Sequence, residues 1–305
     1  MVHKTVKIKE IISFLDNDII NVFGEIGEKT IDNLADAEHV NSSTLDWVNS
    51  RKENKQEIVE NSKAGCIMVD EGVEYSDAIQ TQRKILLVVK NPRMSMANIA
   101  EHFFLNKIEK GVHFSAIIHQ DAKIASSVSI GAGCVIGKAT IGPNTVLMPN
   151  VVVYDDVEIG TNCLIQAGAV IGTDGLGCSR DTEGRLHKFP HLGGVIIGDD
   201  VEIGANCQIA RGVLSNTIIG NGCKMNGLCF ISHNCHLEEN VWITGNTMLC
   251  GSVHVGKNAT IFSGVTVRDQ RTIGDGVTIG MGAIITKNIP DGETWVGNPA
   301  RKMEK

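Results

Sequence analysis

Aliphatic residues recur at every sixth position through the C-terminal half of the chain. The run comprises Ile219, Met225, Ile231, Leu237, Ile243, Leu249, Val255, Ile261, Val267, Ile273, Ile279 and Ile285. A helix with about 3.6 residues per turn would spread these side chains around its surface, and a plain strand repeats every two residues. An unbroken period of six instead predicts a parallel β-helix. About three hexads, or roughly 18 residues, close one triangular coil, and the aliphatic residue points inward.

The same period begins earlier in the chain and is interrupted there. The earlier positions are Ile118, Ile124, Ile130, Ile136, Ile141, Leu147, Val153, Ile159, Ile165, Ile171, Ile197, Ile203 and Ile209. The step from Ile136 to Ile141 is one position shorter than the others, and residues 173–194 lack the pattern altogether. We predict that 173–194 form a loop extruded from the coil. In solenoids such insertions gather on the working face.

Residues before about position 105 lack the period of six and predict a small mixed α/β domain. The segment KIKEIISFLD is amphipathic and predicts a helix, whereas KAGCIMVDE and KILLVVKN predict short buried strands. Asn91-Pro92 indicates a turn before a helix over MSMANIAEHFF. The predicted organisation is an α/β domain at 1–105, a linker at 106–112, a β-helix at 113–290 and a C-terminal tail at 291–305.

Composition agrees with this architecture and excludes some classes of partner. Aromatic residues make up only 4% of the 305 residues, and most of the 33 glycines fall at hexad corners. The formal charge is −7 without a basic face or tail, so nucleic acid is not an expected partner. The N-terminus lacks the apolar core of a signal peptide, and no apolar run reaches membrane-spanning length. We therefore expect a cytoplasmic protein without a membrane span.

The cysteines point to packing rather than chemistry. Six of the nine follow an aliphatic position by four residues, where a hexad takes a small inward-facing side chain. These are Cys134, Cys163, Cys207, Cys223, Cys229 and Cys235. A free cysteine behaves as a small hydrophobe, and the spacings resemble no zinc site. We predict that they fill the core.

Five segments carry a family resemblance. Before the β-helix they are TIDNLADAEHVNSSTLDWVNSRKENKQEIVENSKAGCIMVDE and KILLVVKNPRMSMANIAEHFF. Within it they are GTDGLG, KFPHLGGVIIGDDVEIGANCQIARGVL and NTIIGNGCKMNGLCFISHNCHL. Together they resemble the UDP-3-O-acylglucosamine N-acyltransferases of lipid A synthesis. The resemblance implies a left-handed β-helix and a nucleotide-binding role for residues 1–105. It also implies a homotrimer with active sites between neighbouring subunits.

His233 in ISHNC is the candidate general base. It lies two residues past Ile231, so its side chain is predicted to leave the strand outward. A neutral imidazole can take the proton of an amine near pH 7 as the nitrogen attacks a thioester. The matching histidine of the resembling family is the catalytic base. An outward histidine taken alone is commonly a surface residue, and the surrounding motif favours the catalytic role.

Gly251 stands one coil, or roughly 18 residues, after His233, which places it about 4.8 Å further along the stack. Its backbone N–H is predicted to stabilise the tetrahedral oxyanion. The resembling family uses the glycine at this position in that way. The alternative is a glycine that merely turns a hexad corner.

Several positions depart from the family pattern. Asn226 replaces an aspartate that helps to order the active site, and we expect it still to hold the tautomer of His233. Ala210 replaces the aspartate of an IDRG motif, of which Arg211 is retained as a substrate contact. The family's second histidine is predicted to be replaced by Gln270.

The nucleotide site also departs from the pattern. Trp47 is predicted to stack on one face of a uracil base, with Asn49 or Ser50 providing hydrogen bonds. Glu53 stands where the family has the tyrosine of the opposite face.

The closing segment GAIITKNIPDGETWVGNPARK is similar to the end of coenzyme-A-dependent sugar acetyltransferases. In those enzymes the last coil binds the cofactor, so Lys287, Arg301 and Lys302 are candidate phosphate contacts. Solvated surface is the alternative. The helices that help to form the carrier-protein and long-acyl sites of the lipid A enzymes are not seen, and we expect a shorter acyl group.

These features predict an N-acyltransferase. It would move an acyl group from acyl-CoA or acyl carrier protein to the amine of a nucleotide-linked amino sugar, for lipid A or a surface polysaccharide such as O-antigen. The extruded loop, through Asp174, Lys188 and His191, is predicted to line the pocket of a neighbouring subunit, and Asn234 to contact the substrate. No metal or tightly bound cofactor is required.

Two other classes of function stay open at this point. One class of carbonic anhydrase shares the fold and binds zinc through histidines between subunits. His236 and His254 are one coil apart and predicted to stack on one outer column, with His233 nearby. That interpretation leaves the insert and the N-terminal domain unexplained. A non-catalytic scaffold or nucleotide-sensing solenoid is the second alternative, which the family-like surroundings of His233 and Gly251 disfavour.

Overall fold

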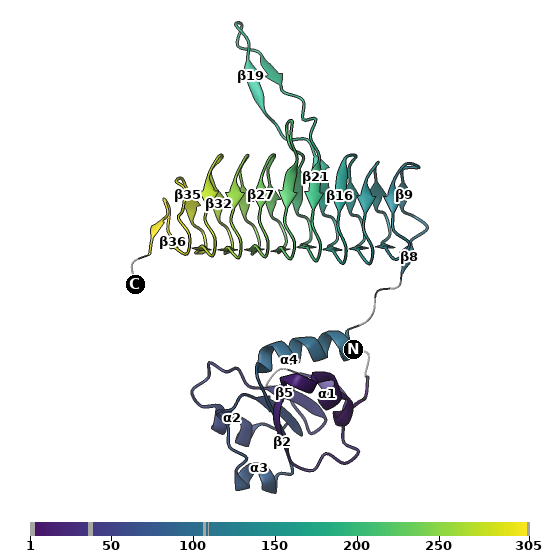
Figure 1. The fold of residues 1–305 in the computed structure, drawn as a ribbon, viewed down its shortest axis with the longest axis vertical. Coiled ribbons are helices and arrows are strands. Elements are labelled where there is room, and N and C mark those ends of the chain that lie inside the picture. Colours follow the sequence, from purple (N-terminus) through teal and green to yellow (C-terminus); the bar gives the residue numbers. More distant parts are fainter. Residues whose placement is uncertain (1–3, 36–38, 106–107, 109, 304–305) are drawn as a thin grey trace. The chain divides into compact units, whose positions relative to one another are not determined.

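The computed structural model describes residues 4–35, 39–105, 108 and 110–303. The chain divides into two compact units, Met1–Lys107 and Ile108–Lys305 (Figure 1). Among the residues described, no helix has the length and apolarity needed to cross a bilayer.

A five-stranded sheet with the order β2-β7-β6-β5-β4 forms the centre of the first unit. Its strands are β2 (Ile19–Phe23), β4 (Asn33–Leu34), β5 (Thr44–Trp47), β6 (Cys66–Val69) and β7 (Ile85–Val89). Only β2 runs antiparallel to its neighbour, and the other pairs are parallel. Along β6, Cys66 and Met68 pack into one core while Ile67 and Val69 pack into the other. Both faces are covered, which is why the central strands read as continuous apolar runs.

Four α-helices supply the two cores. They are α1 (Ile8–Leu15), α2 (Lys55–Asn61), α3 (Asp77–Thr81) and α4 (Pro92–Ile99). Helices α1 and α4 contribute to one core and α2 and α3 to the other. Short elements complete the unit: β1 (Val6–Lys7) pairs with β3 (Thr30–Ile31), the 3-10 turn η1 covers Asp16–Asp18, and the π-helical turn η2 covers Ala100–Phe104. Asn91 caps α4 by accepting a hydrogen bond from Met94 N at 3.1 Å. The predicted helices and strands of this region are confirmed.

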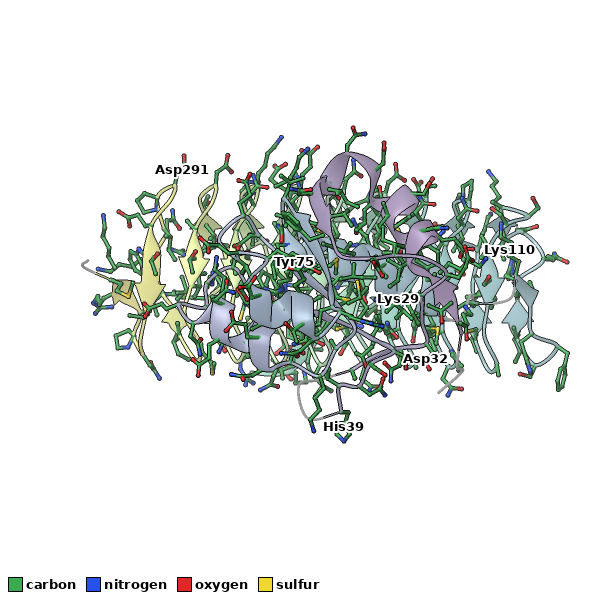
Figure 2. All side chains as sticks on the ribbon, turned by 90° about the horizontal axis from the view of Figure 1, so that it is seen from below. Lys29, Asp32, His39, Tyr75, Lys110 and Asp291 are labelled. Carbon is green, nitrogen blue, oxygen red and sulfur yellow. The ribbon has the colours of Figure 1, made fainter. Side chains whose placement is uncertain are left out.

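The second unit is a parallel β-helix with three long sheets of 8, 11 and 9 strands. The first contains β10 (Lys123–Ile124), β13 (Thr140–Ile141), β16 (Val157–Ile159), β21 (Val195–Ile197), β24 (Thr217–Ile219), β27 (His236–Leu237), β30 (His254–Val255) and β33 (Thr272–Ile273). The second contains β8 (Gly111–Val112), β11 (Ser129–Ile130), β14 (Val146–Leu147), β17 (Leu164–Ile165), β22 (Glu202–Ile203), β25 (Lys224–Met225), β28 (Trp242–Ile243), β31 (Thr260–Ile261), β34 (Thr278–Ile279), β36 (Thr294–Val296) and β37 (Arg301–Lys302). The third contains β9 (Ile117–Ile118), β12 (Val135–Ile136), β15 (Val152–Val153), β18 (Val170–Thr173), β23 (Gln208–Ala210), β26 (Phe230–Ile231), β29 (Met248–Leu249), β32 (Thr266–Val267) and β35 (Ile284–Ile285). Lys110 and Asp291 lie towards opposite ends of this stack (Figure 2).

The aliphatic positions form the core of the β-helix, as predicted. From Ile130 to Ile285 each of them is at most 3% exposed. Ile118 and Ile124 are only partly buried, because their strands stand at the end of their sheets and are covered from one side. Successive coils pair in register, so that residues at equivalent positions of neighbouring coils lie side by side, as Met248 and Thr266 do.

The interruptions of the period have clear structural counterparts. Val157 pairs with Val195, because the segment 173–194 leaves the coil between them. Within it β19 (Cys178–Arg180) and β20 (Leu186–Lys188) form a hairpin that projects from the β-helix (Figure 1). Val195 in turn pairs with Thr217, so this coil is also longer than a standard one and carries a short insertion within 211–216. The sequence pattern had not identified this second insertion.

Strands of the β-helix extend into both the predicted linker and the predicted tail. Gly111–Val112 (β8) pairs with β11 and belongs to the first coil. Asn106, Lys107 and Glu109 of the predicted linker lie outside the described residues. After residue 290, β36 extends the second long sheet and β37 folds back antiparallel on it.

The six cysteines at hexad positions are buried and free, which confirms that they fill the core. Burial raises the pKa of the Cys235 thiol to about 12 and that of Cys223 to about 11. These two thiols therefore stay protonated near pH 7 and are poor nucleophiles.

The stacked aliphatic positions should dominate the stability of the β-helix. Ile273 is fully buried while its neighbour Thr272 is exposed. We expect Ile273→Ala to lower the free energy of unfolding by about 2–5 kcal/mol, because it leaves a cavity in a close-packed stack. The matched variant Thr272→Ala should change it by no more than about 0.5 kcal/mol. Urea unfolding followed by circular dichroism measures both, and equal effects would contradict the assignment of the inward column.

Candidate active site

His233 lies at the corner that follows β26, two residues beyond the buried Ile231. Gly251 occupies the same position in the next coil, since Ile231 pairs with Leu249. A methyl group added to Gly251 would lie 2.5 Å from Cε1 and 2.6 Å from Nε2 of His233, so a larger residue there would displace this ring. Within the described residues the Gly251 N–H makes no hydrogen bond. The predicted stacking of the two residues is confirmed, and their catalytic roles stay predictions.

The extruded loop returns to the same corner and brings His191 against His233. The two rings meet edge to face, with their centroids 5.3 Å apart. His191 is 4% exposed, and its Nδ1 donates to the carbonyl of Phe189 at 3.1 Å. Its Nε2 is then a bare, buried acceptor with no partner among the described residues. The prediction had assigned His191 to the pocket of a neighbouring subunit, whereas this contact is made within one chain.

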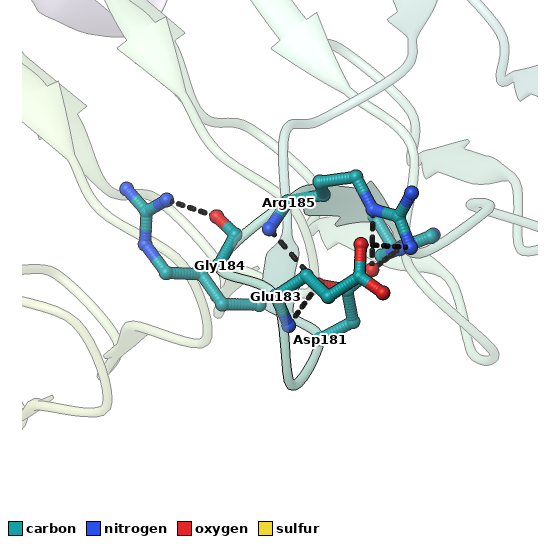
Figure 3. Close-up of polar contacts among 6 residues, drawn as sticks. Asp181, Glu183, Gly184 and Arg185 are labelled. Carbon is teal, nitrogen blue, oxygen red and sulfur yellow. Dashed lines mark hydrogen bonds and ion pairs between the residues drawn. The ribbon is translucent and has the colours of Figure 1, made fainter.

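Polar contacts at the tip give the hairpin a defined turn (Figure 3). The Asp181 carboxylate accepts hydrogen bonds from the backbone N–H groups of Glu183 and Arg185, both at 2.9 Å. The Arg185 side chain pairs with the same carboxylate at 3.0 Å, and Arg180 donates to the Gly184 carbonyl at 2.7 Å. These contacts hold together the two strands that lead to His191.

Asn234 fixes the orientation of His233. Its Oδ1 accepts a hydrogen bond from Val213 N at 3.0 Å, and its Nδ2 donates to the carbonyl and hydroxyl of Ser215 at 3.3 and 2.9 Å. These contacts determine which amide atom is oxygen. That oxygen lies 3.1 Å from His233 Nδ1 and can only accept, so Nδ1 carries the proton. Nε2 is left as the basic nitrogen, on the side of Gly251.

Val213 and Ser215, which hold the Asn234 side chain, belong to the short insertion within 211–216. Leu192 N donates to the Val213 carbonyl at 2.7 Å, which joins the base of the extruded loop to the insertion. Thr217 Oγ1 accepts a hydrogen bond from Asn234 N at 2.9 Å. The roles of Ser215 and Thr217 were not predicted. The signal that could have revealed them is the step from Ile209 to Ile219, which is longer than one hexad.

Charged groups of the loop and of the insertion lie on the same side of the coil. Lys188 forms an ion pair with Asp174 at 2.5 Å, which lowers the pKa of the Asp174 carboxyl. The nearby His191 and Arg211 lower this pKa further. Arg211 itself donates to the Asp155 carbonyl at 2.7 Å and pairs with Asp156 at 3.2 Å. The predicted sugar or acyl contacts 174, 188, 191 and 211 therefore cluster, but Arg211 is already engaged within the chain.

Asn226 lies at another corner of the coil, whereas Gln270 lies beside Gly251, whose carbonyl accepts a hydrogen bond from Gln270 N at 2.9 Å. Asn226 follows β25, one corner before His233, and faces a hollow of about 390 Å³ that Lys224 and Trp242 also line. It makes no contact with His233 within the described chain, so Asn234 and not Asn226 holds the tautomer. Gln270 stacks on the column of Asn234 rather than on that of His233, which continues through Gly251 to Asp269. The prediction that Gln270 takes the place of the family's second histidine stays a prediction.

The remaining predicted contacts are spread over both units. In the first unit Trp47 ends β5 and packs partly against the core, while Asn49 Oδ1 accepts from Arg51 N at 3.0 Å. At the end of the β-helix Lys302 pairs with Glu293, and Lys287 is exposed. Arg301 and Lys302 are consecutive in β37, so their side chains point to opposite faces. The structure does not gather these three basic residues into one phosphate site.

Histidines also meet outside this corner, but not in the predicted set of three. The rings of His236 and His254 lie 5.0 Å apart, and Glu238 stands beside both. His233 is not part of this cluster, because it turns toward His191 at the preceding corner. Within one chain, the three histidines of the alternative zinc site therefore do not come together.

Comparisons with protein families define the class. Residues 138–173 match the model of the bacterial transferase hexapeptide (six repeats). Residues 194–226 and 272–287 match that of the hexapeptide repeat of succinyl-transferase. The fold and these repeats define a hexapeptide-repeat transferase.

Curated relatives identify the family. The chain is 33% identical over 248 residues to a UDP-3-O-acylglucosamine N-acyltransferase of Francisella tularensis, covering 74% of this chain and 70% of the relative. It is 31% identical over 230 residues to the enzyme of that name from Polynucleobacter asymbioticus, covering 66% of this chain and 64% of the relative. The match thus spans slightly less than two thirds of the Polynucleobacter relative. The chain belongs to the UDP-3-O-acylglucosamine N-acyltransferase family.

Solved structures agree with the fold. The UDP-N-acetylglucosamine O-acyltransferase of Moraxella catarrhalis is 28% identical with a TM-score of 0.58, covering 63% of this chain and 73% of that one. The UDP-N-acetylglucosamine acyltransferase of Francisella novicida has the same identity and TM-score, covering 63% and 70%. The prediction of a left-handed parallel β-helix with hexapeptide repeats is confirmed.

The role of Asn234 can be tested without an activity assay. In protein labelled with ¹⁵N-histidine, the ring nitrogen shifts of His233 should report a proton on Nδ1. Asn234→Ala removes the fixed acceptor, and we expect His233 to shift towards the Nε2-protonated tautomer. Asn258→Ala is the matched control, because both asparagines have left-handed backbone, with φ of 59° and 57°. A proton on Nε2 of His233 in the unsubstituted protein would contradict the assignment.

Proposed function

We propose that this chain is an N-acyltransferase that acts on a nucleotide-linked amino sugar. The acyl group comes from an acyl thioester, carried by acyl carrier protein or coenzyme A, and the product serves the synthesis of lipid A or of a surface polysaccharide. Membership of the UDP-3-O-acylglucosamine N-acyltransferase family supports the class of reaction. The geometry around His233 supports the mechanism.

The observation that carries the proposal is the imidazole of His233, held with its basic nitrogen beside Gly251. Asn234 Oδ1 accepts from Nδ1 at 3.1 Å, which leaves Nε2 free to take a proton. Glycine at position 251 lets that ring lie against the backbone, where a larger residue would displace it. A general base needs a free lone pair held in a fixed direction, and this corner supplies one.

The reaction is a direct attack on the thioester. The sugar nitrogen forms a bond to the carbonyl carbon while His233 Nε2 takes its proton. The Gly251 N–H donates a hydrogen bond to the oxyanion of the tetrahedral intermediate. The intermediate then collapses with cleavage of the carbon–sulfur bond, and the proton passes from His233 to the departing thiolate. Atoms and charges balance without a metal or a redox step.

His191 completes the amine pocket in this proposal. Its Nε2 is buried and unpartnered among the described residues, and its ring meets that of His233. A bare acceptor of this kind is costly in an apolar setting unless a donor arrives. The amine or a hydroxyl of the sugar is such a donor. Asp174 and Lys188, which form an ion pair, are proposed to contact the sugar or the acyl group.

The other substrate contacts follow the family pattern. We assign the nucleotide base to the first unit, with Trp47 as the stacking surface and Asn49 as the hydrogen-bonding group. Lys287 and Arg301 remain candidates for the phosphates of an acyl-CoA donor. Arg301 and Lys302 face opposite ways, so they would not act on the same phosphate.

A homotrimer suits the distribution of groups over the coil. Asn226 and the hollow beside Trp242 lie one corner away from His233, and Asn226 makes no contact with His233 within the described chain. In a cyclic three-fold assembly one surface of each subunit contacts a different surface of the next. We propose that Asn226 serves the active site of a neighbour in this way.

A product-mass assay tests the proposal. Purified protein is incubated with UDP- and dTDP-linked amino sugars and with short and long acyl donors on coenzyme A or acyl carrier protein. We expect one pair to give an acylated nucleotide sugar. We expect His233→Ala to lower kcat by roughly 100-fold or more, the range for losing a general base.

His119→Ala is the matched control, since His119 is an exposed histidine of the same β-helix and lies far along the chain from this corner. Product formed equally well by His233→Ala would show that another group takes the proton. No acylated product from any pair would overturn the proposed function.

A further inference from the structure

A second cluster of titratable side chains lies on the first long sheet and has no part in the proposed acyl transfer. His236 belongs to β27, Glu238 follows that strand, and His254 belongs to β30 in the next coil. The three side chains are 41%, 31% and 41% exposed, so the cluster is open to small ions on one side.

The period of the β-helix brings these donors together. His236 and His254 stand one coil apart and pair directly in the parallel ladder. Each precedes an inward residue, Leu237 and Val255, so both imidazoles point outward. Glu238 follows Leu237 and therefore returns to the same outer side. Two imidazoles from successive coils thus share one carboxylate.

The distances match a metal site better than a hydrogen-bonded triad. The Nε2 atoms of His236 and His254 lie 3.5 and 3.7 Å from the same oxygen of Glu238, Oε1. A charge-assisted hydrogen bond would be about 2.7–2.9 Å long. In tetrahedral zinc coordination, bonds of about 2.0–2.1 Å set neighbouring ligand atoms about 3.4 Å apart. All three potential ligand atoms lie within 4.8 Å of one another.

We propose that His236, Glu238 and His254 bind a divalent transition-metal ion. Imidazole and carboxylate donors suit borderline ions such as Zn²⁺, Co²⁺ and Ni²⁺ rather than the oxygen-preferring Mg²⁺ and Ca²⁺. Three protein ligands leave a fourth position for water or another donor.

The ion would cross-link two neighbouring coils. Since His236 and Glu238 come from one coil and His254 from the next, coordination ties β27 to β30 across a strand pair. A ligand that binds only the folded chain stabilises it by RT ln(1 + L/Kd), where L is the concentration of free ligand. His236 lies on the strand that directly follows the His233 corner. The metal cross-link would therefore also stabilise the two coils that position His233 and Gly251.

Zinc titration of the full-length protein tests the proposal. Every arm carries Cys178→Ser, because Cys178 is an exposed thiol that could bind zinc by itself. Isothermal titration calorimetry should detect one Zn²⁺ per chain. His236→Ala, His254→Ala and Glu238→Gln should each weaken its Kd by at least about tenfold, since even groups that only support a ligand cost this much. His119→Ala should leave the Kd unchanged.

Two further readouts keep the test independent of folding and of activity. Co²⁺ in the same site should give the visible bands of a tetrahedral nitrogen and oxygen environment, without a thiolate charge-transfer band. Zn²⁺ should raise the melting temperature of the parent chain but not that of the three cluster variants, whose circular dichroism should match the parent's. The proposal is overturned if the parent binds no zinc, or if the cluster variants bind it as the parent does. Neither result depends on whether the chain transfers acyl groups.

Discussion

The stacking of aliphatic side chains at one position per hexad is the constraint on which the rest of the second unit depends. Each inward residue packs on its counterparts in the coils above and below, and the three long sheets keep these columns in register. A one-residue slip would turn a whole column outward, so the register is strongly fixed. The positions of the outward-facing side chains are fixed by the same register. The contact between His233 and Gly251 and the pair of His236 and His254 both arise because equivalent positions of successive coils stack on each other.

Both insertions leave the β-helix at its corners, where no inward residue is needed. Both the 173–194 loop and the short insertion at 211–216 interrupt the chain without displacing an inward column. They pack on each other through Leu192 and Val213, and the insertion holds Asn234, which orients His233. The corner around His233 is thus built from irregular chain supported by a rigid stack, the arrangement that suits a site of defined polar groups.

Most of the fold could be predicted from the sequence, because the position of a residue within the six-residue repeat determines whether its side chain points inward or outward. The inward columns, the buried cysteines and the stacking of Gly251 on His233 follow from counting. Contacts made by segments outside the repeat could not be predicted in this way. Gln270 lies one residue beyond the column of His233, which leads to Asp269, and its role stays a prediction. The contacts of Asn234 with Ser215 and of His191 with His233 depend on how two non-repeating segments meet, which no local pattern records. The place of Glu238 beside two histidines was also not predicted, because it depends on how the outer side chains of two successive coils meet.

The central claim is that His233 Nε2 receives the proton of the sugar amine. An experimentally determined structure of the protein with a bound nucleotide amino sugar tests it most directly. The account predicts the amine nitrogen within about 2.6–3.2 Å of His233 Nε2, with Gly251 lining the position of the acyl carbon. A sugar whose amine lies away from this corner, for example in the hollow beside Trp242 with no His233 near it, would contradict it.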